Sequence, residues 1–157
     1  MSASSLKVPS FSGMISEDKK QHHYWTSVYL EDTDLGGVVY HANYLNFAER
    51  ARTEFLNLLG IRHADMMQKD GYGCFFVVHE CAITFLKPAV FGDLLEIQTT
   101  FVKTTKVRLF LLQEIFKGNV LIARLHITLA CVKNRESPTK IPHTILSALK
   151  PFLKEDP

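Results

Sequence analysis

The feature that most constrains the fold is one long helix pattern, which stands between a single strand-like run and four later ones. The predicted helix spans residues 43–59 and ends before Gly60, the residue a helix terminus favours. Its apolar residues recur at spacings of three and four and form one stripe: Tyr44, Phe47, Ala51, Phe55 and Leu58. Four charged residues lie off this stripe, where we expect the glutamates to pair with nearby arginines on the surface: Glu49, Arg50, Arg52 and Glu54.

The strand-like runs have the spacing of an antiparallel sheet. The first covers residues 24–30 and is followed by a loop over 31–37. Four more runs follow at hairpin-like separations: residues 76–86, 94–102, 107–116 and 119–132. Shorter helices are expected over 63–69 and, with Pro142 near its first turn, over 142–153. One helix facing a five-stranded antiparallel sheet is an α+β fold.

Composition narrows the class of protein. A chain of 157 residues suits one domain, and a net charge of +2 is too small to indicate a nucleic-acid binder. We expect a single domain over 22–153 behind a mobile extension over 1–21, with no membrane-spanning run. The three cysteines form no CxxC motif, which favours reduced thiols and a cytoplasmic location. Histidine and cysteine spacings indicate no metal site.

The most informative stretch runs from residue 29 to 44. It contains an Asp-Thr-Asp triplet at 32–34, the run Gly-Gly-Val-Val-Tyr-His at 36–41, and Asn43-Tyr44 at the expected helix start. This stretch resembles the signature of the 4-hydroxybenzoyl-CoA thioesterase-like family of the hotdog fold, and most closely the Tol-Pal-associated acyl-CoA thioesterase group. The later Lys87-Pro88-Ala89…Gly92-Asp93 turn is similar to the same pattern. The resemblance implies a hotdog fold, in which the sheet wraps the central helix.

The resemblance also implies which residues act on an acyl-CoA thioester. Asp34 would be the catalytic carboxylate, as general base toward water or as nucleophile, whereas Asp32 would form the turn. Glycines at 36 and 37 let backbone approach a ligand closely. The backbone N–H of Tyr40 or His41, beside the helix N-terminus, would bind the developing oxyanion. Two roles stay open for the His41 side chain: a direct one, donating to the carbonyl or orienting water, and a structural one near the helix start.

A cluster of basic and hydroxyl residues lies between two predicted strands. Its members are Lys103, Thr104, Thr105, Lys106 and Arg108. By composition alone this is a solvated hairpin, but the resemblance implies contact with the phosphates of CoA. The sequence does not decide which of the five makes that contact.

Several alternatives stay open at this stage. Glu49 would be the next choice of catalytic group, because a second hotdog branch uses a helix glutamate. The chain could instead be a hotdog dehydratase acting on acyl-carrier-protein thioesters, or a non-catalytic acyl-binding module. No bound cofactor is needed for thioester hydrolysis. We expect a homo-oligomer, a dimer of dimers, because a five-stranded sheet leaves two edges. Asp34 would then share its pocket with residues near 75–78 of another chain.

Overall fold

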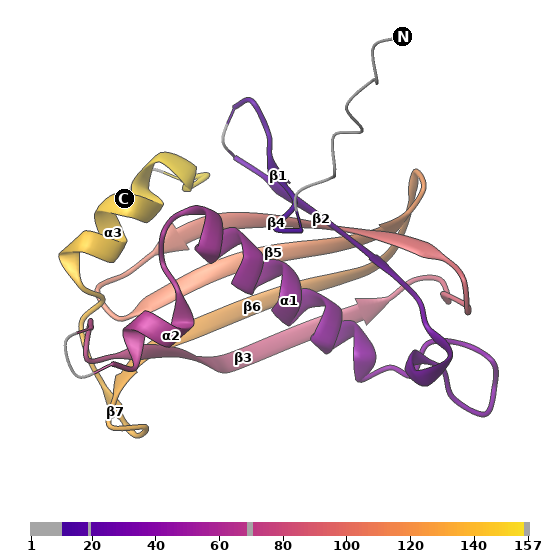
Figure 1. Ribbon diagram of the computed structural model, residues 1–157, viewed down its shortest axis with the longest axis horizontal. Coiled ribbons are helices and arrows are strands. Elements are labelled where there is room, and N and C mark those ends of the chain that lie inside the picture. The colour runs from indigo at the N-terminus through magenta and orange to yellow at the C-terminus, as the bar shows by residue number, and fades with distance from the viewer. Residues whose placement is uncertain (1–10, 19, 69–70, 156–157) are drawn as a thin grey trace, which may run out of the picture.

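The computed structural model describes residues 11–18, 20–68 and 71–155. One antiparallel sheet dominates it, with strand order β1-β2-β4-β5-β6-β3 and β7 paired to β6. Figure 1 shows α1 lying across one face of this sheet. The strands are β1 (Met14–Ile15), β2 (His22–Ser27), β3 (Phe75–Phe85), β4 (Leu94–Thr104), β5 (Arg108–Lys117), β6 (Val120–Lys133) and β7 (Ser137–Pro138). The helices are η1 (Leu30–Asp32), α1 (Asn43–Leu58), α2 (His63–Met66), α3 (His143–Leu149) and η2 (Lys150–Phe152).

The predicted α+β architecture is confirmed, because the expected long helix and the five expected strands are all present. Two short strands, β1 and β7, extend the sheet. The first strand ends at Ser27 rather than at residue 30, because the chain turns there into η1. The Val28 N–H already donates to the carbonyl of Asp93, which ties this turn to the start of β4. Among the described residues no helix is long and apolar enough to cross a membrane.

Helix α1 packs its apolar stripe onto the sheet, with Phe47 and Phe55 fully buried. The prediction was wrong for Arg52, which is only 9% exposed and lies on the packed face. Its Nη1 donates to Oε1 of Gln113 on β5 at 3.0 Å, so a polar partner on the sheet accommodates the guanidinium. Neither Glu49 nor Glu54 forms the ion pair expected with an arginine within the described part of the chain.

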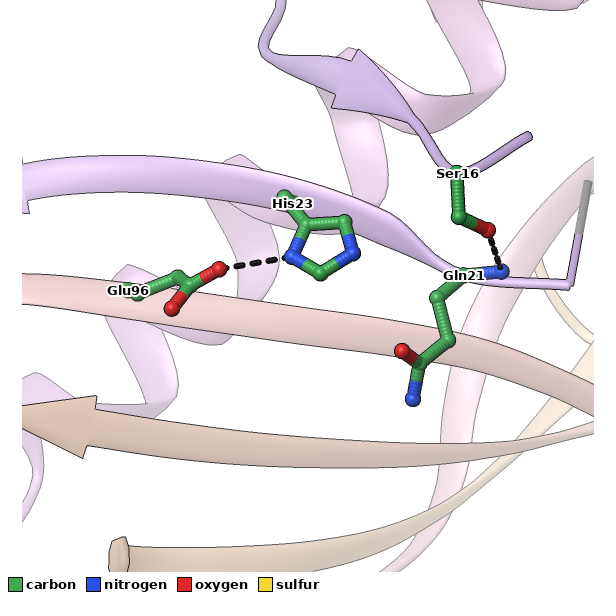
Figure 2. A network of polar contacts seen from close by, with 4 residues as sticks. All are labelled: Ser16, Gln21, His23 and Glu96. Atoms are coloured by element: carbon green, nitrogen blue, oxygen red, sulfur yellow. Dashed lines mark hydrogen bonds and ion pairs between the residues drawn. The ribbon is translucent and has the colours of Figure 1, made fainter. Parts of the chain in front are cut away.

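The segment before β2 folds back along the sheet. Met14 pairs with His23, and the ring of His22 stacks on Phe55 with centroids 4.9 Å apart. Figure 2 shows that the Ser16 hydroxyl accepts the Gln21 N–H, and that His23 contacts Glu96 of β4 on the neighbouring strand. Met14 and Ile15 fall inside the predicted extension over 1–21. Residues 1–10 and 19 of that extension lie outside the described residues, and the proposed domain boundary stays a prediction.

The two edges of the sheet differ in length. One edge is the two-residue β1, whereas the other is the eleven-residue β3. Most β3 side chains are exposed, including Val78 at 52% and Phe85 at 48%. A long edge strand of this kind offers unpaired backbone groups to another strand.

Candidate active site

The loop that carries Asp34 is a tight turn closed by its own backbone. The Asp34 N–H donates to the Val38 carbonyl at 2.9 Å, and the Gly37 N–H donates to the Asp34 carbonyl at 3.0 Å. Gly37 has φ of +79°, a conformation that residues with a side chain rarely adopt. The Gly36 N–H donates to Oδ1 of Asp34 at 2.8 Å. The turn therefore fixes both the backbone and one carboxylate oxygen of Asp34.

The same loop is held against the segment before β4. Val39 donates its N–H to the carbonyl of Ala89 at 2.8 Å, and Val38 forms an isolated bridge with Val90. In return the Ala89 N–H donates to the hydroxyl of Tyr44, in the first turn of α1, at 3.2 Å. Burial raises the pKa of that Tyr44 hydroxyl. These contacts join the loop, the helix start and the 89–90 segment into one unit.

Asp32 has a different place from Asp34. It is 7% exposed, and its Oδ2 accepts the Tyr29 N–H at 2.8 Å. Its backbone carbonyl accepts the N–H of Tyr40 and the side-chain amide of Asn43, both at 2.9 Å. Asp32 therefore organises the turn, as expected, and Asp34 is the exposed carboxylate of the pair.

A cavity of about 350 Å³ opens beside Asp34. Its lining residues come from the loop, from the start of α1 and from the end of β3: Asp34, Val38, Val39, His41, Tyr44, Phe85, Leu86, Lys87 and Pro88. The ring of Phe85 meets Tyr44 edge-on, with centroids 5.4 Å apart, and also faces the His41 ring at 6.5 Å. The cavity is thus lined by apolar side chains together with a carboxylate and an imidazole. Phe47, from the apolar stripe of α1, does not line this cavity and is a fully buried core residue.

Lys87 also lines the cavity, although the sequence pattern predicts only that it stands in a turn. It stands two residues after the end of β3, and Phe85, Leu86 and Lys87 all line the cavity. The Lys87-Pro88 dipeptide signals the end of a strand, and nothing in that signal says that Lys87 shares a cavity with Asp34. The lysine adds a positive charge to a site whose only acidic lining residue, among those described, is Asp34.

The two expected oxyanion donors differ in availability. The Tyr40 N–H already donates to the Asp32 carbonyl at 2.9 Å. No backbone acceptor is found for the His41 N–H among the described residues. His41 stands two residues before α1, which has no acidic residue in its first turn, so the positive end of the helix dipole faces this region uncompensated. A group that gains negative charge in the cavity would be stabilised there.

Glu49, the alternative carboxylate, lies elsewhere. It is exposed on α1, and its Oε1 accepts the hydroxyl of Thr53 at 2.7 Å. It lines a separate cavity of about 170 Å³, together with Arg52, Phe76 and Val78 near the start of β3. Glu49 and Asp34 therefore line two different cavities of one chain.

The basic cluster lies at the far end of the sheet from Asp34. The loop of Asp34 is bonded through Val38 and Val39 to residues 89–90, which precede β4, whereas the cluster surrounds the turn that follows β4. Eleven residues of strand separate these positions, a length of about 35 Å. Thr104, Thr105 and Lys106 line another cavity there, of about 410 Å³. Lys103 and Arg108 do not line it, and the Lys103 ammonium lies 5.3 Å from the centre of the Phe110 ring.

Comparison with known proteins adds a family to this geometry. The sequence pattern of the Thioesterase superfamily matches residues 36–123. The acyl-CoA thioester hydrolase YbgC of Escherichia coli O6:H1 is 37% identical over 127 residues, which cover 78% of this chain and 91% of that protein. The acyl-CoA thioesterase YbgC of Haemophilus influenzae is 34% identical over 122 residues, covering 77% and 88%. The structure of a probable thioesterase from Bartonella henselae superposes with a TM-score of 0.73 at 35% identity, covering 78% and 99%.

Proposed function

This chain belongs to the thioesterase superfamily, and we propose that it hydrolyses acyl-CoA thioesters with Asp34 as the catalytic carboxylate. The relatives named above support the reaction. The assignment to Asp34 rests on its exposed carboxylate, which lines a cavity beside the N-terminal end of α1. The first turn of that helix has no acidic residue to offset the positive end of its dipole.

In the proposed reaction, the thioester carbonyl enters the cavity next to Asp34 and His41. The Asp34 carboxylate removes a proton from water as the water oxygen bonds to the carbonyl carbon. The carbonyl oxygen becomes an oxyanion, which the His41 N–H and the helix terminus stabilise. The carbon–sulfur bond then breaks, and the CoA thiolate receives the proton. If Asp34 is instead the nucleophile, an acyl-enzyme anhydride forms first and water hydrolyses it.

We place the site between two copies of the chain. Within one chain the length of β4 separates Asp34 from the basic cluster. Two β3 edges joined about a two-fold axis run antiparallel, which brings the Asp34 end of one chain beside the hairpin end of its partner. The exposed β3 edge supports this pairing. Lys106 of one chain would then bind the phosphates of a CoA molecule whose acyl group reacts at Asp34 of the other chain.

Hybrid assemblies test this shared site. One chain carries Asp34→Asn and the other carries Lys106→Ala, and the two are co-purified with different tags. We expect the hybrid to recover turnover at the wild-type KM, because one of its sites combines an intact Asp34 with an intact Lys106. A hybrid whose KM equals that of the Lys106→Ala protein would contradict sharing. So would a fully active species with the mass of one chain in light scattering.

The reaction itself is tested with a panel of thioesters. Short, long and aromatic acyl-CoA esters are compared with the same acyl groups on acyl carrier protein, and with hydroxyacyl esters that a dehydratase would act on. We expect release of free CoA thiol from at least one acyl-CoA ester. Loss of water from a hydroxyacyl ester without thiol release would identify a dehydratase instead.

A further inference from the structure

Of the two backbone donors expected to bind the oxyanion, one already has a partner. The Tyr40 N–H donates to the Asp32 carbonyl, whereas the His41 N–H has no backbone acceptor among the described residues. An oxyanion site gains from every further donor that is fixed in place before the reaction, and tyrosine hydroxyls can serve as such donors. The side chains that line the cavity are the remaining source of a second donor.

Among the described residues that line the cavity beside Asp34, three side chains can donate a hydrogen bond: His41, Tyr44 and Lys87. His41 and Lys87 are exposed, so water competes for their donors. Tyr44 is only 3% exposed, which makes it the buried donor of the three. A buried donor needs little solvent reorganisation when charge develops beside it, so Tyr44 is the best placed of them to stabilise an oxyanion.

The Tyr44 side chain is held in place on several sides. Phe85 meets its ring edge-on with centroids 5.4 Å apart, and Phe47 does so at 6.2 Å. At the end of the ring, the hydroxyl accepts the N–H of the fully buried Ala89 at 3.2 Å. The loop holds Ala89 in turn, because the Ala89 carbonyl accepts the Val39 N–H at 2.8 Å. The folded chain therefore fixes the position of the hydroxyl oxygen.

The Tyr44 hydroxyl still has its own proton to donate. The bond from Ala89 uses a lone pair of the oxygen, and no acceptor for the hydroxyl proton is found among the described residues. A hydroxyl that accepts one hydrogen bond becomes a stronger donor in the next, because the two bonds polarise each other. Burial raises the pKa of Tyr44, although the bond from Ala89 partly opposes this, so the hydroxyl keeps its proton at neutral pH.

Tyr44 also stands close to the free backbone donor. The Asn43 N–H donates to the Tyr40 carbonyl at 2.8 Å, so helical winding begins just before α1. Positions three residues apart in such a turn lie on the same side. His41 and Tyr44 have this spacing, and both line the cavity beside Asp34. One bound oxygen could therefore meet both donors.

Resting on the thioesterase function proposed above, we propose that the Tyr44 hydroxyl is a second oxyanion donor and acts together with the His41 N–H. As the water oxygen bonds to the carbonyl carbon, the electron pair of the C=O π bond moves onto the carbonyl oxygen. The Tyr44 O–H donates a hydrogen bond to that oxygen and keeps its proton. The electron pair then re-forms the C=O bond while the carbon–sulfur bond breaks and the thiolate leaves.

The kinetic test is Tyr44→Phe, which removes the hydroxyl and keeps the ring. We expect kcat on an acyl-CoA ester to fall about 100-fold, as for loss of one oxyanion donor. KM should change little, because the bond strengthens mainly in the transition state. Tyr24→Phe is the matched control and should keep the wild-type kcat, since half-buried Tyr24 stands on β2 and does not line this cavity. Unchanged kcat in Tyr44→Phe would overturn the proposal.

A spectroscopic test separates donation from a structural role, because Tyr44→Phe also deprives the Ala89 N–H of its acceptor. The probe is a ketone analogue of acyl-CoA, in which a methylene group replaces the thioester sulfur and the carbonyl carbon is isotopically labelled. Binding to the wild type should lower the infrared stretching frequency of this carbonyl, and Tyr44→Phe should reverse part of the shift. Tyr44→fluorotyrosine keeps the bond from Ala89 and donates more strongly, so it should lower the frequency further. This variant provides the test if Tyr44→Phe folds poorly.

The possible outcomes are distinct. Equal carbonyl frequencies in the wild type and both Tyr44 variants would overturn the proposal. So would a shift that Lys87→Met reverses and Tyr44→Phe does not, which would make Lys87 the donor. If the thioesterase function itself is wrong, the wild type will release no thiol from any acyl-CoA ester and will not bind the analogue, which overturns both proposals. Normal turnover in Asp34→Asn would refute only the catalytic carboxylate, because the carbonyl measurement uses protein with Asp34 intact.

Discussion

The Gly36 N–H donates to Oδ1 of Asp34 across a single turn, at 2.8 Å. A Cβ added to Gly36 would lie 3.1 Å from that same oxygen, closer than most side-chain contacts. The position of the carboxylate therefore depends on residue 36 having no side chain. This relationship links a glycine of the sequence motif directly to the proposed chemistry.

Replacing Gly36 with Ala should displace the Asp34 carboxylate slightly and reduce kcat about tenfold, because reactions of this kind are sensitive to small misplacements. Stability should change little, since Gly36 is exposed and its φ does not lie in the left-handed region. Steady-state kinetics and thermal melting check both expectations. Leu35→Ala is the control in the same turn, because Leu35 is fully exposed and lines no part of the cavity. Equal turnover in the two variants would contradict the argument.

Gln113 is predicted to be a main support of the buried Arg52. The Gln113 side chain is fully buried and also donates through Nε2 to the Ala48 carbonyl and to the Thr99 hydroxyl, both at 2.9 Å. Gln113→Leu leaves the guanidinium without this acceptor and should lower the free energy of unfolding by about 2–4 kcal/mol. Urea unfolding measures the loss.

Two further variants make the Gln113 experiment specific. Gln98→Leu introduces the same change on β4 at a half-buried residue outside this network, and it should cost less than about 1 kcal/mol. Adding Arg52→Met to Gln113→Leu should restore part of the stability, because the buried charge is then gone. The control comparison is the cost of Arg52→Met in the wild type. If Arg52→Met lowers the stability of the Gln113→Leu protein by that same amount, the two side chains do not interact.

His22 should make stability depend on pH. Burial lowers the pKa of its imidazole, although the contact of Nε2 with the Ser12 carbonyl partly opposes this. The folded state thus binds the proton less readily than the unfolded chain, whose histidine pKa is about 6.5. The stability that His22 contributes is therefore fully present above the unfolded-state pKa of about 6.5. It is lost as the pH falls through the lower pKa of His22 in the folded state.

His22→Phe tests this dependence, because phenylalanine keeps the stacking on Phe55 and cannot titrate. Chemical unfolding between about pH 7.5 and pH 5 should give a flatter stability profile for this variant than for the wild type. His63→Ala, at an exposed site on α2, should leave the slope unchanged. An unchanged slope in His22→Phe would show that other groups determine the pH dependence.

The fold could be predicted from periodicity because α1 and the long strands have clear patterns. Spacing alone predicted a solvent-exposed Arg52, because a charged residue next to an apolar stripe is normally exposed. Its buried partner Gln113 is distant in sequence, so the spacing within the helix could not reveal this contact. The place of Asp34 in a turn before α1 could be predicted from the sequence motif. Glycines of this motif permit the turn, as Gly37 does with its positive φ.

Relations between distant segments could not be predicted. The sequence puts the basic cluster in a hairpin but does not say at which end of the sheet that hairpin lies relative to Asp34. That follows from β2 pairing with β4, with Ser27 opposite Leu94. The approach of α3 to Lys106 and the presence of Lys87 and Asp34 at one cavity likewise depend on tertiary packing.

The most direct test of the account is the turnover of Asp34→Asn on an acyl-CoA ester that the wild type hydrolyses, measured beside Glu49→Gln. Asparagine keeps the shape of Asp34 and removes the charge, and Glu49→Gln makes the same change on α1. We expect Asp34→Asn to lower kcat by about two to four orders of magnitude, the usual range for loss of a general base, with wild-type melting behaviour. Glu49→Gln should keep near-normal turnover. Near-normal turnover in Asp34→Asn, together with loss of activity in Glu49→Gln, would contradict the account and move the catalytic carboxylate to the helix.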